Sequence, residues 1–142
     1  MTLGLAGLLA TGVALHLAEL SARRPLRVTD LLPLHLCDMA IFVALFALLT
    51  RRRWAVELLF YWTFTGTLLA SVTPALSQGF PTWRFVTYFL LHGGVIIAAA
   101  ILVFGHGLPP RPGGAVRAWL LTNLYAALVL VALGGSLALS PG

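Results

Sequence analysis

Charged residues are scarce in this sequence. Only 9% of its 142 residues are Asp, Glu, Lys or Arg, whereas a typical soluble domain carries about 25%. Too few polar side chains are present to cover a water-exposed surface, which argues against a soluble globular protein. Because 60% of the residues are hydrophobic, the composition predicts an all-α polytopic membrane protein.

Lysine is absent, and all nine basic residues are arginine. The arginines occupy short junctions between apolar runs, where they face lipid headgroups and set orientation. The net charge of +5 is therefore no sign of nucleic-acid binding, and no nucleic-acid partner is expected. In a five-span arrangement the N-terminal side holds five arginines and the other side four, which favours a cytoplasmic N-terminus.

Cysteine occurs once, at Cys37. A single cysteine excludes an intrachain disulfide and leaves three roles for the thiol: a small buried hydrophobe, a metal ligand or a nucleophile. The first ten residues contain no basic segment of the kind that opens a secretory signal. The first apolar run is therefore expected to be a retained helix.

Five apolar runs are present, and each approaches the roughly 17–25 residues that a membrane-spanning helix needs. They predict a transmembrane helical bundle of about five spans, with a single domain over residues 1–142. The predicted helices cover residues 2–20, 34–50, 54–72, 83–104 and 116–139. We expect a multi-pass protein of the cell membrane, in bacteria the inner membrane, with lipids as solvent and potential substrate. Homo-oligomer formation is left open.

Polar residues gather where the second predicted helix begins. The stretch "DLLPLHLCDMA" places His35, Cys37 and Asp38 within four residues, although polar groups are expensive in lipid. His35 and Asp38 are three residues apart and share a helix face. Cys37 lies about 200° around the helix from His35, so these two residues are expected to have different roles.

His92 is the polar residue of the fourth predicted helix, in "FLLHGGVII". At 1.5 Å per residue, Cys37 lies ~7 Å and His92 ~13 Å from the same side of the membrane. The two can meet if the second and fourth helices are neighbours. An imidazole can accept the thiol proton, so Cys37 and His92 are candidate catalytic residues for acyl transfer. His35 and Asp38 would shape the headgroup-side mouth.

Other interpretations of the same residues stay open. His35 and Asp38 also fit a polar cluster at a helix start, and Glu57 with Tyr61, at i, i+4 spacing, lies in the opposite half of the bilayer. A bundle that binds or transports a small molecule or ion is one alternative function. A haem protein with His35 and His92 as axial ligands is another. No metal site and no cofactor are expected.

Several stretches resemble the YwaF-like bacterial integral membrane proteins, whose eukaryotic relative is transmembrane protein 164. They are "LPLHLCD" (32–38), "ASVTPALSQGFP" (70–81) and "RFVTYFLLHGGVI" (84–96), within a similarity over about two-thirds of the chain. The eukaryotic relative is regarded as a cysteine-dependent phospholipid acyltransferase. The resemblance thus implies a nucleophilic role for Cys37 and an acid–base role for His92. The family usually has more than five helices, so a shortened member is expected.

Overall fold

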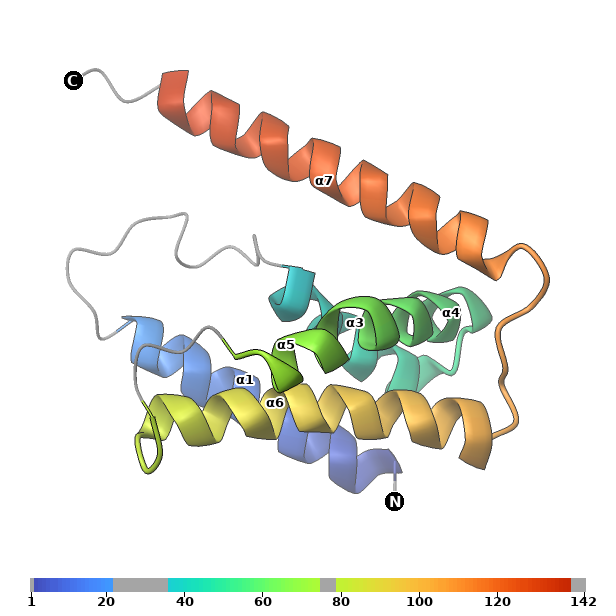
Figure 1. Cartoon of the computed structure of the whole chain (residues 1–142), viewed down its shortest axis with the longest axis horizontal. Coiled ribbons are helices and arrows are strands. Elements are labelled where there is room, and N and C mark those ends of the chain that lie inside the picture. Colours follow the sequence, from blue (N-terminus) through green and yellow to red (C-terminus); the bar gives the residue numbers. More distant parts are fainter. Residues whose placement is uncertain (1, 22–35, 75–78, 139–142) are drawn as a thin grey trace.

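The structure is a computed structural model that describes residues 2–21, 36–74 and 79–138. Within these residues every regular element is helical (Figure 1). The α-helices are α1 (Thr2–Ser21), α3 (Leu36–Thr50), α4 (Arg53–Trp62), α5 (Leu68–Val72), α6 (Trp83–Ala100) and α7 (Gly114–Ala138). A π-helical turn at Thr63–Thr67 joins α4 to α5, and a second at Ile101–Gly105 extends α6. The predicted all-α fold class is confirmed.

In the described part of the chain the elements form five helical rods, as the apolar runs predict. Three rods are long and apolar enough to cross a membrane: Arg53–Val72, Trp83–Gly105 and Gly114–Gly135. The apolar helices Thr2–Ala18 and Leu36–Thr50 are shorter. The rod count agrees with the prediction of about five spans, and the protein is an integral membrane protein. The assignment of residues 1–142 to a single domain stays a prediction.

Helix α3 lies at the centre of the bundle, where it packs against α1, α4 and α6. Its inner face carries Ala40, Ala44 and Ala47, all at most 1% exposed, at the i, i+4, i+7 spacing of one helix face. Small side chains let neighbouring helices approach closely in lipid. The predicted packing of the second helix against the fourth is confirmed by the contact of α3 with α6.

Glycines allow an equally close crossing of α1 over α6. A Cβ atom at Gly94 would lie 2.6 Å from Leu9 Cδ2, and one at Gly12 would lie 2.7 Å from Leu91 Cδ2. Leu9 therefore packs into the space that Gly94 leaves, and Leu91 does the same at Gly12. This reciprocal contact brings α1 to the half of α6 that carries His92.

Helix α7 stands apart from the other rods. It begins beside α4, against which it packs, and then diverges from the bundle toward its C-terminal end (Figure 1). The apolar side chains of its far half are exposed, with Leu128, Leu130 and Val131 at 61%, 70% and 73%. In a bilayer these side chains face lipid acyl chains, because that region contains no water.

Candidate functional site

His92 is buried in α6, with 8% of its surface exposed. Its Nδ1 lies 2.9 Å from the carbonyl oxygen of Tyr88, one turn earlier. A carbonyl oxygen only accepts hydrogen bonds, so Nδ1 carries the proton and donates it. In the neutral ring Nε2 then holds a free lone pair, which makes this nitrogen a base or a ligand.

The His92 ring is held in one orientation by Tyr88. The two rings stack, with centroids 3.9 Å apart and planes inclined by 25°. The Tyr88 hydroxyl donates a hydrogen bond of 2.8 Å to the Ala70 carbonyl of α5, which fixes Tyr88 in turn. Within the described part of the chain, His92 Nε2 is buried and has no hydrogen-bond partner. Such an orphaned buried atom calls for an explanation, and water or ligand binding is one.

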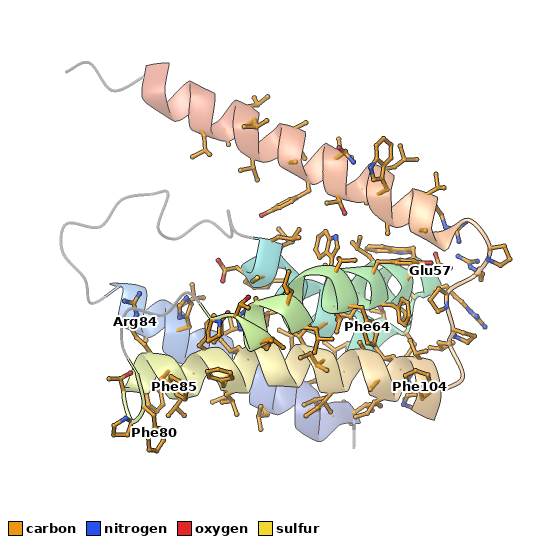
Figure 2. All side chains as sticks on the ribbon, viewed as in Figure 1. Glu57, Phe64, Phe80, Arg84, Phe85 and Phe104 are labelled. Atoms are coloured by element: carbon orange, nitrogen blue, oxygen red, sulfur yellow. The ribbon has the colours of Figure 1, made fainter. Side chains whose placement is uncertain are left out.

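A cavity of about 130 Å³ opens beside His92 between α1, α3 and α6. This volume has room for several water molecules. Its lining is unusually polar for a membrane bundle and consists of His16, Asp38, Ile41, Arg84, Thr87, Tyr88, Leu91 and His92. Arg84, labelled in Figure 2, lies at the end of the bundle away from Glu57. We call this space the His92 cavity. It brings Asp38 and His92 together, whereas sequence reasoning assigned no role in it to Arg84 or Tyr88.

Cys37 is half-buried and lines a second, smaller cavity. This Cys37 cavity has a volume of about 10 Å³ and is formed by Leu36, Cys37, Ala40, Trp62, Gly66 and Thr67. Because His92 Nε2 has no hydrogen-bond partner, Cys37 Sγ does not donate to it directly. The catalytic roles of Cys37 and His92 stay a prediction, and His35 lies outside the described residues.

The wall of the Cys37 cavity includes the π-helical turn between α4 and α5. Gly66 and Thr67 belong to this turn, and π-helical turns occur frequently at functional sites. Thr63, the first residue of the turn, is fully buried, and its Oγ1 has no hydrogen-bond partner in the described structure. The sequence "TFTGT" gave no periodicity signal by which this local change of helix type could be predicted.

The sequence of this chain matches a protein family over nearly its whole length. The model of the TMEM164 family matches residues 1–138. The chain belongs to the TMEM164 family. The predicted relationship to transmembrane protein 164 is therefore confirmed. No curated protein and no solved structure gives a significant match to this TMEM164-family chain.

A second polar cluster of this TMEM164-family chain lies at the opposite end of the bundle. Glu57 of α4, with a side chain 3% exposed, forms salt bridges with Arg111 at 2.8 Å and Arg117 at 3.0 Å. The backbone N–H of Arg111 also donates to Glu57 Oε1. Sequence reasoning read these two arginines as orientation signals only. The signal that could have found the cluster is Glu57 itself, since an acid in a spanning segment needs a partner.

Proposed function

We propose that this protein transfers or hydrolyses the acyl chains of membrane lipids, with Cys37 as nucleophile and His92 as base. The single observation that supports this proposal best is the state of His92. Its Nδ1 proton is committed to the Tyr88 carbonyl, and its Nε2 lone pair is buried without a partner. An imidazole inside a membrane bundle marks a functional site by default. We also propose the cell membrane, in bacteria the inner membrane, as its location.

The chemistry balances as two transfers. In this proposal a water molecule between the two side chains relays the Cys37 thiol proton to His92 Nε2, since no direct hydrogen bond joins them. The thiolate attacks a lipid ester carbonyl, forming a C–S bond. The C–O bond then breaks, and the imidazolium protonates the departing lysolipid oxygen. In the second transfer His92 removes a proton from the hydroxyl of a lysolipid or from water, and the oxygen attacks the thioester to form a new C–O bond. The C–S bond then breaks, and the imidazolium returns its proton to the Cys37 thiolate.

Asp38 and Arg84 place both signs of charge on the wall of the His92 cavity. This pattern suits a zwitterionic or otherwise polar headgroup at the end of the bundle where α3 and α6 begin. A binding role without turnover is the second candidate function, and the same polar lining is the observation that favours it.

The test is acyl exchange between a labelled phospholipid and a lysophospholipid by purified protein in vesicles. Cys37→Ala should abolish exchange, and wild type should carry an acyl mass on Cys37 that hydroxylamine removes. His106→Ala, which changes an exposed histidine of the 106–113 loop, is the matched control and should remain active. Full activity of folded Cys37→Ala would overturn the proposal. Folded wild type that binds lipid without exchange would favour the second candidate.

A further inference from the structure

A third cavity lies between α4 and α7, where α7 begins to leave the bundle. Its volume is about 270 Å³. We call it the α4–α7 groove. It is lined by Leu36, Tyr61, Trp62, Thr65, Ala115, Ala118, Trp119 and Thr122. Neither the proposed catalytic chemistry nor the family assignment gives this space a role.

Two threonine hydroxyl groups and the Trp62 indole N–H of the groove are engaged in hydrogen bonds within the protein. Thr65 Oγ1 donates to the Tyr61 carbonyl at 2.7 Å. Thr122 Oγ1 donates to the Ala118 carbonyl at 2.7 Å and accepts the Trp62 Nε1–H at 2.7 Å. A polar ligand would find these three groups occupied, and burying it without hydrogen bonds would be unfavourable. Most of the surface that lines the groove is apolar, which suits an apolar occupant.

The groove adjoins the Cys37 cavity. Leu36 and Trp62 line both spaces, and Leu36 directly precedes Cys37 on α3. On its outer side the groove is bounded by α7, whose spanning segment is almost entirely exposed. At the depth of a membrane span, the surroundings of such a helix are lipid acyl chains rather than water. The occupant best matched to the groove is thus present in the membrane itself.

We infer that the α4–α7 groove binds one acyl chain of a membrane lipid, with its carboxyl end toward Cys37 and its tail toward Ala115. The divergence of α7 from the bundle gives the chain lateral access from the bilayer. Occupation of the groove stands on its own geometry. The orientation of the carboxyl end rests on the proposed function, because only an acyl-accepting Cys37 requires it.

The test uses phosphatidylcholine with a photoreactive diazirine in one acyl chain, mixed into vesicles that contain the full-length protein. After irradiation, crosslinked residues are mapped by mass spectrometry. Trp62 is only 5% exposed, so bulk lipid does not reach its side chain. Ile97 on α6 is 52% exposed and reports general lipid contact. We expect crosslinks at Trp62 as well as at Ile97.

Ala115 is exposed and lines the groove, so Ala115→Phe should fill it. Most of the Trp62 crosslink should then be lost while the Ile97 crosslink is kept. Val116→Phe adds bulk at the next residue, about 100° around the helix and outside the groove lining. It should leave both crosslinks unchanged. Ala115→Leu serves as a milder filling variant, and thermal unfolding checks that each variant is folded.

Two results would overturn the inference. One is labelling of Ile97 without Trp62 in wild type. The other is an unchanged Trp62 crosslink in folded Ala115→Phe and Ala115→Leu. Cys37→Ala separates this inference from the proposed function, because it should stop acyl exchange and keep the Trp62 crosslink. If Cys37→Ala exchanged acyl chains and still showed the Trp62 crosslink, the catalytic proposal would fail and the acyl-chain site would stand.

Discussion

Among the described residues, each end of the bundle buries one titratable side chain. The two side chains differ in how far their hydrogen-bonding groups are satisfied. Glu57 receives four hydrogen bonds from Arg111 and Arg117. His92 makes one hydrogen bond through Nδ1 and leaves Nε2 without a partner in the described structure. A buried charge whose partners are present is tolerated in a fold, whereas an unsatisfied buried base lowers stability and is typical of a functional site.

The Glu57 end acts as a structural clamp. Its partners come from the 106–113 loop and the first turn of α7, so one carboxylate ties α4 to the start of α7. The hydrogen bond to Glu57 raises the pKa of the Arg111 guanidinium above its ordinary value. The clamp holds the near end of α7 against α4 and leaves the far end free to diverge.

The largest expected effect is on turnover at the His92 end. His92→Phe keeps an aromatic ring that can stack on Tyr88 but removes the base, so acyl exchange should fall by about 10²–10⁴-fold. The unfolding free energy should change by less than ~1.5 kcal/mol, because the volume is nearly kept and the orphaned nitrogen is removed. Exchange assays and thermal unfolding of the same preparation measure both quantities.

The first prediction distinguishes the two ends of the bundle only if His92→Phe lowers acyl exchange without lowering stability. A large fall in stability with His92→Phe would show that the histidine is structural, and the contrast between the two ends would disappear. Thr87→Val, at a residue that also lines the His92 cavity, would show how far turnover responds to a change in the cavity wall that spares the base.

A smaller effect, on stability alone, is expected at the Glu57 end. Glu57→Gln removes the charge that both arginines contact, and the free energy of unfolding should fall by about 1–3 kcal/mol. The arginine side chains are 49% and 44% exposed, so solvent partly replaces the lost contacts. Acyl exchange per folded molecule should stay unchanged. An exchange loss matching that of His92→Phe would contradict the division of roles.

The smallest effect concerns the contact that closes α4 onto α7 between the two ends. Trp62→Phe removes the hydrogen bond to Thr122 Oγ1, which should cost about 0.5–1.5 kcal/mol of stability. Trp119→Phe, at an exposed side chain of α7, is the matched control and should stay within ~0.5 kcal/mol of wild type. Equal effects of the two substitutions would show that the Trp62 hydrogen bond does not hold α7.

The helices could be predicted from sequence because a membrane span is marked by its length and apolar composition. The side chains that share a cavity could not. Cys37 and Asp38 are adjacent and have the same predicted depth, yet they line different cavities. A difference of about 100° around a helix decides this, and depth carries no such information. The partners of Glu57 lie 54 and 60 residues away, beyond any local pattern.

The Tyr88–His92 contact, unlike the contacts of Glu57, joins residues that are close in sequence. The two residues stand at the i, i+4 spacing that brings side chains together on one helix face, so their stacking is a local feature. Whether His92 Nε2 has a hydrogen-bond partner is not a local feature, because it depends on which side chains of α1 and α3 reach this nitrogen. The sequence could therefore identify His92 as a candidate residue, but only the structure shows that its Nε2 has no partner among the described residues.

The π-helical turn at Thr63–Thr67 changes the direction in which side chains point on the two sides of it along one rod. Such a turn holds one residue more than an α-helical turn, which rotates everything after it by about 100°. Glu57 precedes the turn, whereas Gly66 and Thr67 within it face the Cys37 cavity. A single-residue deletion here would keep the salt bridges and turn the cavity wall away from Cys37. Related chains can therefore form this cavity only if they keep the number of residues between Glu57 and Gly66.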